Sequence, residues 1–167
     1  MSVAYRLIVV GTDNSADADA AVEFAAELAR SASAPLHIVA MHHSFPHTLS
    51  GAHVSTSIMT RLDGLHSLHE SAEARMVEIH RTHIERHAQR LRRRGIDVSI
   101  HVVSGDPANR LADLAADLGA DLVVVGAHGL HRRRRRVTSV AVSVVRSARV
   151  PVLVVPATGC PVELSWR

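Results

Sequence analysis

The sequence predicts an α/β protein in which helices cover both faces of an open, doubly wound parallel sheet. Short β-branched runs alternate with longer segments whose apolar residues recur at helical spacing. The runs are apolar at nearly every position, which is typical of strands buried on both faces. Aromatic residues make up only 2% of the chain, so Val, Leu, Ile and Ala must build the core. Such an alternation favours right-handed crossovers between parallel strands.

The elements can be placed in order along the chain. A strand in "YRLIVVGTD" precedes a helix that Asn14 or Ser15 caps, and "PLHIVAMHH" forms the second strand. A loop over 44–61 leads to a long amphipathic helix that stops at Gly95. The remaining elements are a strand in "DVSIHVVSG", a helix from Asp106 and Pro107 to Gly119, a strand in "DLVVVG", a helix in "TSVAVSVVRSARV" and a strand in "PVLVVP".

Length and composition limit the class of protein. A chain of 167 residues is the size of one domain, here 1–167 with a tail at about 157–167. A single cysteine, Cys160, excludes an internal disulfide. The N-terminal stretch has no signal-peptide or membrane-span pattern, so we expect a cytoplasmic protein with no membrane partner.

The ends of the first and fourth predicted strands, "VGTDNS" and "VGAHG", are the candidate ligand site. Ligands of open α/β sheets bind beyond the carboxyl ends of the strands, where the winding direction reverses. Gly126 and Gly129 allow a ligand to approach the backbone, and Thr138 and Ser139 would open the next helix, where free amides bind anions. A tight turn from strand to loop would explain the two glycines equally well.

These motifs resemble the universal stress protein family. Its ATP-binding members carry Gly, two residues, Gly, nine residues, then Gly and Ser or Thr, followed by a helix and "PVLVV". This chain has Gly126, Gly129, Ser139 and "PVLVV" at 151–155. The stretches "VVGTDNSADADAAVEFAAELA" and "GDPANRLADLAADLGADLVVVGAHG" are also similar, so the resemblance covers nearly the whole chain except 44–61 and the tail.

The resemblance implies a five-stranded sheet of order 3-2-1-4-5 and a stress-response protein that binds ATP or a related adenine nucleotide, with Mg²⁺ as a further expected cofactor. Asp13 would meet the adenosine, Met41 would lie against adenine, and Gly126, Gly129 and Ser139 would hold ribose and phosphates. His128, between the glycines, is placed to donate to a phosphate. The resemblance also implies a homodimer joined through Val152–Val155, at the exposed sheet edge.

Two departures from the family motif define an alternative function. Thr138 stands where the motif has its third glycine, and the preceding stretch is one residue shorter than nine. A β-branched residue does not readily take the positive φ that glycine allows. The alternative is a dimeric interaction protein with an altered pocket that does not bind ATP.

The basic residues leave three interpretations of the loop after Gly129. All 19 cationic side chains are arginines, and five of them are consecutive, Arg132 to Arg136. Arg132 and its neighbours would clamp phosphates, because guanidinium groups suit them. A solvated loop is an equal alternative. Nucleic-acid binding is disfavoured, since aromatic stacking residues are scarce.

Histidines of the long helix form one stripe with a methionine: His69, Met76, His80, His83 and His87. Spacings of three and four bring imidazoles within reach of one cation, but a polar flank of the packed face or a contact with another helix is the other explanation. We place no metal ligand from this pattern, because no carboxylate has a diagnostic spacing. No catalytic motif or general base is evident either, so we predict at most a slow ATPase.

Overall fold

The computed structural model describes residues 5–42, 56–127 and 140–156. Its strands are β1 (Ile8–Thr12), β2 (Leu36–His42), β3 (Val98–Ser104), β4 (Leu122–Gly126) and β5 (Val152–Val155). Its helices are α1 (Ala16–Ala32), α2 (Thr56–Arg93), α3 (Pro107–Asp117) and α4 (Val140–Ser147). The predicted alternation of strands and helices is confirmed.

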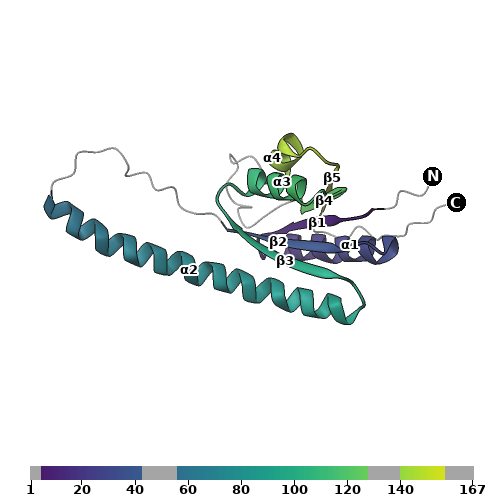
Figure 1. The fold of residues 1–167 in the computed structure, drawn as a ribbon, viewed down its shortest axis with the longest axis horizontal. Helices are drawn as coiled ribbons and strands as arrows, with labels where there is room; N and C mark the ends of the chain where they lie inside the picture. Colours follow the sequence, from purple (N-terminus) through teal and green to yellow (C-terminus); the bar gives the residue numbers. More distant parts are fainter. Residues whose placement is uncertain (1–4, 43–55, 128–139, 157–167) are drawn as a thin grey trace.

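The strands form one five-stranded sheet of order β3-β2-β1-β4-β5, and every neighbouring pair is parallel. The predicted fold class and strand order are therefore confirmed. Helices α1 and α2 lie on one face of the sheet, and α3 and α4 lie on the other (Figure 1). The chain winds outward from β1 to β3 and then returns to add β4 and β5, so the winding direction reverses between β1 and β4.

Alternating residues of each central strand fill two separate cores. Ile8 and Val10 of β1 point to the α1–α2 face, whereas Val9 points to the α3–α4 face. All three are fully buried, which explains why their run in the sequence is apolar at every position. Both cores consist mainly of aliphatic side chains and alanine, as the composition requires.

Local signals set most helix ends where the sequence predicts them. Ser15 caps α1 by accepting a hydrogen bond from the Ala18 amide at 3.2 Å. The Asp106 carboxylate caps α3 by accepting from the amides of Ala108 and Asn109, both at 3.0 Å. Gly119, just after α3, has a φ of 67°, a left-handed conformation that glycine adopts without steric cost.

The start of α2 differs from the prediction. The helix begins at Thr56, inside the stretch 44–61 that the composition assigns to a loop, and it runs for 38 residues. Ser and Thr disfavour helix interiors by only a few tenths of a kcal/mol, so they do not prevent a helix that no proline interrupts. The first half of α2 extends beyond the sheet (Figure 1). None of the helices in the described ranges combines the length and hydropathy that crossing a membrane requires.

Candidate functional site

Strands β1 and β4 separate at their carboxyl ends. Their ladder ends at Val10↔Val124, yet β1 continues to pair with β2 as far as Thr12↔Ala40. On its other side, β4 continues to pair with β5 as far as Gly126↔Val155. Beyond Val10 and Val124, β1 therefore pairs only with β2 and β4 only with β5 among the described strands. Asp13, the residue after β1, and Gly126, the last residue of β4, consequently lie at the same edge of the sheet, at the reversal of winding.

The turn after β1 holds Asp13 by local hydrogen bonds. Asp13 Oδ1 accepts a hydrogen bond from the Ser15 amide at 3.1 Å, and Thr12 Oγ1 accepts one from the Asn14 amide at 3.2 Å. Asn14 has a φ of 62°, a left-handed conformation that asparagine tolerates better than most residues. The short sequence Thr-Asp-Asn-Ser therefore sets the position of the half-buried Asp13 carboxylate.

Met41 lies near the same edge but faces the α3–α4 core. Only 7% of the residue is exposed. A β-carbon placed on Gly11 would lie 3.1 Å from Met41 Cε and 2.7 Å from Leu111 Cδ2, so both side chains pack directly on the β1 backbone. Glycine at this position allows that close approach. The predicted contact of Met41 with adenine stays a prediction.

The rest of the predicted nucleotide site lies outside the described residues. This applies to five residues of the predicted site: His128, Gly129, Arg132, Thr138 and Ser139. The arginine run 132–136 also falls there. Helix α4 covers Val140–Ser147 of the described residues, and the predicted role of Thr138 and Ser139 at its start stays a prediction.

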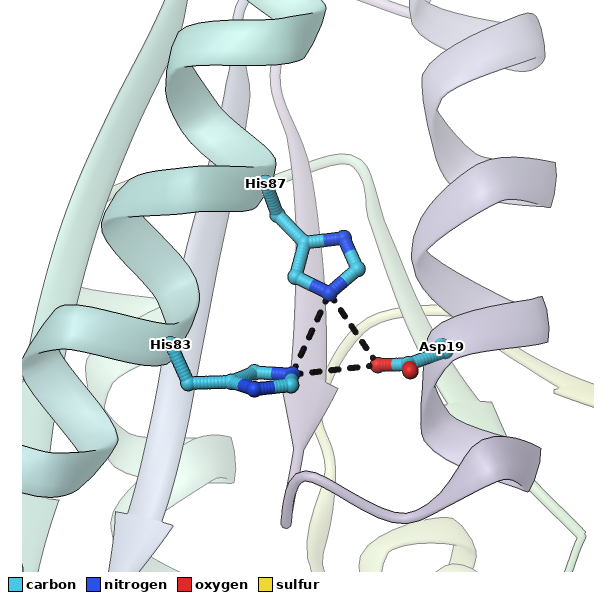
Figure 2. Close-up of side chains that lie close together, drawn as sticks. All are labelled: Asp19, His83 and His87. Atoms are coloured by element: carbon cyan, nitrogen blue, oxygen red, sulfur yellow. Dashed lines mark hydrogen bonds and ion pairs between the residues drawn. The ribbon is translucent and has the colours of Figure 1, made fainter.

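A cluster of titratable side chains lies between α1 and α2. Asp19 of α1 faces His83 and His87 of α2 (Figure 2). His87 Nε2 is 3.2 Å from His83 Nε2 and 3.2 Å from Asp19 Oδ1. The distance from His83 Nε2 to Asp19 Oδ1 is 3.4 Å. In the part of the chain that the structure describes, this is the one group of three His, Cys, Asp or Glu side chains whose ligand atoms all lie within 4.8 Å of one another.

The cluster is one end of a longer row of charges, which we call the α1–α2 seam. Along α1, Asp19, Glu23 and Glu27 recur every four residues and so share one face. Arg90 pairs with Glu23, and Arg94 pairs with both Glu23 and Glu27. The seam thus consists of three carboxylates facing His83, His87, Arg90 and Arg94.

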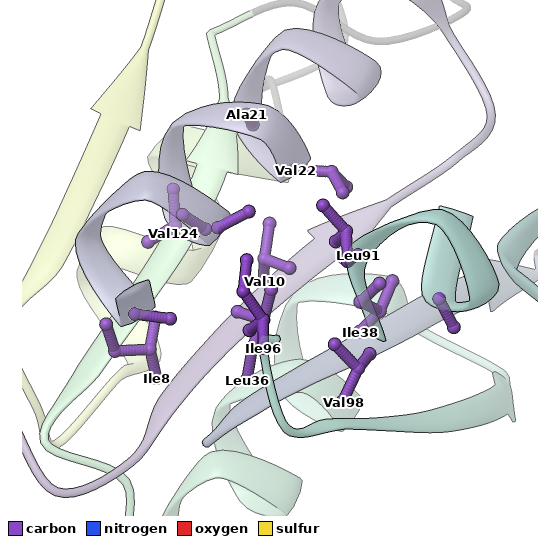
Figure 3. Close-up of a cluster of buried hydrophobic side chains, with 14 of the residues drawn as sticks. Ile8, Val10, Ala21, Val22, Leu36, Ile38, Leu91, Ile96, Val98 and Val124 are labelled. Carbon is purple, nitrogen blue, oxygen red and sulfur yellow. The ribbon is translucent and has the colours of Figure 1, made fainter. Parts of the chain in front are cut away.

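Buried aliphatic side chains beneath the seam hold the two helices in this register. Val22 of α1 and Leu91 of α2 point toward each other above the sheet (Figure 3). Ile84, Ala88 and Leu91 form a fully buried stripe on α2, and His83 and His87 each precede a residue of it. The apolar stripe therefore turns both imidazoles toward α1.

Burial lowers the pKa of His87 below its usual value of 6.5, although the Asp19 carboxylate acts in the opposite direction. The lowered pKa favours the neutral form of His87 near pH 7.

Of the predicted stripe, His80 is buried, Met76 is exposed, and the side chain of His69 lies outside the described residues. The prediction missed Asp19. The four-residue spacing of Asp19, Glu23 and Glu27 indicates one acidic face of α1. Nothing in the local sequence indicates which residues of α2 that face contacts.

A second pair of imidazoles lies on the other face of the sheet. His101 Nε2 of β3 is 3.0 Å from His37 Nδ1 of β2, and the rings stack with centroids 5.0 Å apart and an angle of 24°. Burial lowers the pKa of both rings, and for His37 the positive charge of His101 adds to the effect. This pair provides an internal comparison for His83 and His87.

Comparison with known proteins identifies the family. The model of the universal stress protein family matches residues 4–156. The chain belongs to the universal stress protein family. A universal stress family protein from Burkholderia pseudomallei is 28% identical, with a TM-score of 0.58, over 93% of this chain and 99% of that chain. UspA from Lactobacillus plantarum, 22% identical over 92% of this chain and 99% of that chain, shares the fold with a TM-score of 0.69.

One relative carries a nucleotide. A universal stress protein in complex with cAMP is 28% identical to this chain, with a TM-score of 0.56, over 93% of this chain and 99% of that chain. The comparison with curated proteins finds no match.

Proposed function

We propose that this universal stress protein binds ATP or a related adenine nucleotide, with Mg²⁺ on the phosphates, and that nucleotide occupancy regulates a stress response. The observation that carries the proposal is the parting of β1 and β4 beyond Val10↔Val124, with Asp13 and Gly126 at the two strand ends. The 28% identical relative in complex with cAMP supports an adenine nucleotide as the ligand.

Each residue of the proposed site has a role that its chemistry permits. The Asp13 carboxylate accepts from the adenine amine or a ribose hydroxyl, and Met41 offers an apolar contact to the base. Gly126 lets the ligand approach the backbone. The anionic phosphates would meet the remaining proposed residues, His128, Gly129, Arg132, Thr138 and Ser139.

A dimeric interaction protein with an altered pocket is the second candidate function. Thr138 in place of glycine favours it, because threonine does not readily adopt positive φ. Strand β5 is at the sheet edge, where β4 is its one partner among the described strands, and Val154 is 39% exposed. An apolar edge of this kind invites pairing through Val152–Val155 with a second copy. Sedimentation at micromolar concentration measures this dimer.

Calorimetric titration with ATP, ADP, AMP and adenosine, with and without Mg²⁺, tests the first candidate. We expect Asp13→Asn to weaken every ligand roughly ten- to hundredfold, because it removes hydrogen bonds to a charged group. The amide oxygen of asparagine can still accept from the Ser15 amide, so the turn is retained. Asp97→Asn is the matched control, since Asp97 is exposed and precedes β3 at the opposite edge of the sheet.

Two further outcomes separate the candidates. No heat with millimolar ATP, in protein shown to be folded, would reject nucleotide binding and leave the interaction protein. Replacing Arg132 to Arg136 by serine tests the phosphate clamp. A clamp predicts a much larger loss for ATP than for adenosine, whereas a solvated loop predicts no loss for either ligand.

A further inference from the structure

Protons alone do not satisfy the triangle of Asp19, His83 and His87 while the Asp19 carboxylate is ionised. Three contacts of 3.2 to 3.4 Å join its atoms, but each Nε2 carries at most one proton. If both imidazoles donate to Asp19, their two N–H groups face each other. If one imidazole donates to the other, the acceptor's lone pair also faces the carboxylate. In each arrangement one of the three contacts is repulsive.

A single cation satisfies all three atoms at once. Zn²⁺ binds histidine nitrogen and carboxylate oxygen at about 2.0–2.2 Å, which in a tetrahedral site puts ligand atoms about 3.3–3.6 Å apart. The three sides of the triangle, 3.2, 3.2 and 3.4 Å, lie at the lower end of that spacing, so small side-chain shifts suffice to receive the ion. We propose that Asp19, His83 and His87 bind a divalent transition-metal ion of the Zn²⁺ class, which joins α1 to α2.

The site is accessible and leaves one position open. The side chains of Asp19 and His83 are 39% and 31% exposed, so a hydrated ion can reach them from solvent. A groove of about 510 Å³, lined in part by Asp19 and His87, adjoins the triangle. Water from this groove supplies the fourth ligand. Two imidazoles select a transition metal over Mg²⁺, which prefers oxygen ligands.

Arg90 competes with the ion for His87. Its guanidinium donates to His87 Nδ1 at 3.1 Å, so Nδ1 is the acceptor and a neutral ring carries its proton on Nε2. Coordination through Nε2 requires the other tautomer, with the proton on Nδ1. Arg90 must therefore leave this contact, and its pairing with Glu23 offers it another. The Arg90→Ala variant should consequently bind the ion several-fold more tightly than the wild type.

Competition between the full-length protein and a chromophoric Zn²⁺ chelator, without nucleotide, tests the site. We expect one tight ion per chain and a loss of at least about tenfold in affinity for each of Asp19→Ala, His83→Ala and His87→Ala. His101→Ala is the matched control, because it removes one imidazole of the other pair. Equal affinities in wild type, ligand variants and control would overturn the proposal, as would weaker binding by Arg90→Ala.

Co²⁺ provides a second measurement that uses the wild type alone and does not depend on the folding of a variant. Tetrahedral Co²⁺ absorbs strongly in the visible region, whereas octahedral Co²⁺ absorbs weakly. The proposal predicts strong absorption that one equivalent of Zn²⁺ removes. Weak absorption at saturation would overturn it. Because neither experiment contains nucleotide, its failure is distinct from failure of the proposed function.

Discussion

The two imidazole pairs of this protein are alike in spacing and different in surroundings. The ring centroids are 5.0 Å apart in the His37–His101 pair and 4.9 Å apart in the His83–His87 pair. The first pair joins two neighbouring strands, and the second lies on one turn of α2. In the described chain, a carboxylate oxygen completes a three-ligand group at the second pair alone, and it comes from α1.

For the proposed metal site, the comparison implies that a short distance between two histidines is not sufficient. In both pairs burial disfavours the imidazolium form of at least one ring. Among the described residues, the difference between the pairs that bears on metal binding is the Asp19 oxygen beside the second pair, and its position depends on how α1 packs against α2. The following predictions test this distinction, from the largest expected effect to the smallest.

Truncating the core beneath the seam should have the largest effect. Leu91 is fully buried between α2 and the sheet, so Leu91→Ala should lower the free energy of unfolding by about 2–5 kcal/mol, through lost burial and a cavity. Urea denaturation measures the change. Ile79→Ala on the same helix is the control, because Ile79 is 57% exposed and should change stability by at most about 0.5 kcal/mol. A similar loss of stability in both variants would contradict a role of the Leu91 core in holding α1 against α2.

Adding a carboxylate to the first imidazole pair should create a second metal site. Ser99 lies directly opposite His37 in the β2–β3 register and on the same face of β3 as His101. In Ser99→Asp, the stoichiometry of tight Zn²⁺ binding should rise from one to two ions per chain, with a strand-propensity cost below about 1 kcal/mol. Ser99→Asn, which adds no charge, is the control. An unchanged stoichiometry would mean that the third ligand atom alone does not separate the pairs.

The smallest expected effect is on the pH dependence of stability. The lowered pKa values of His37 and His101 mean that the folded protein binds fewer protons than the unfolded chain, in which each pKa is 6.5. Above about pH 6.5 both rings are neutral in the folded and unfolded states, so the pair should not make stability depend on pH. As the pH falls below 6.5, the free energy of unfolding should decrease until the pH is below the folded-state pKa values.

Urea midpoints between pH 5 and pH 8 measure this dependence. Replacing both histidines by glutamine should reduce the loss of stability on acidification, because the double variant lacks the titrating rings. Identical pH profiles for the wild type and the double variant would contradict the assignment of this pH dependence to His37 and His101.

Much of the fold and part of the proposed nucleotide site follow from local sequence signals. Ser15, Asp106 and Gly119 set helix ends through contacts with residues a few positions away, so they could be predicted. Apolar runs with glycine stops locate the strands, and the family resemblance supplies their order. Asp13 and Gly126 could be assigned to one edge because the carboxyl ends of parallel strands share it. The start of α2 was missed because its Ser and Thr residues resemble a loop in composition alone.

The sequence patterns by themselves determined the fold class, and the family resemblance that the sequence carries added the strand order. Only the tertiary structure decided that Asp19 meets two histidines 64 or more residues away. Helical spacing determines which side chains share a face of one helix, but it carries no information on the rotation and register of a second helix. Those depend on how Val22, Leu91 and their neighbours pack in a common core, which is a property of the folded chain.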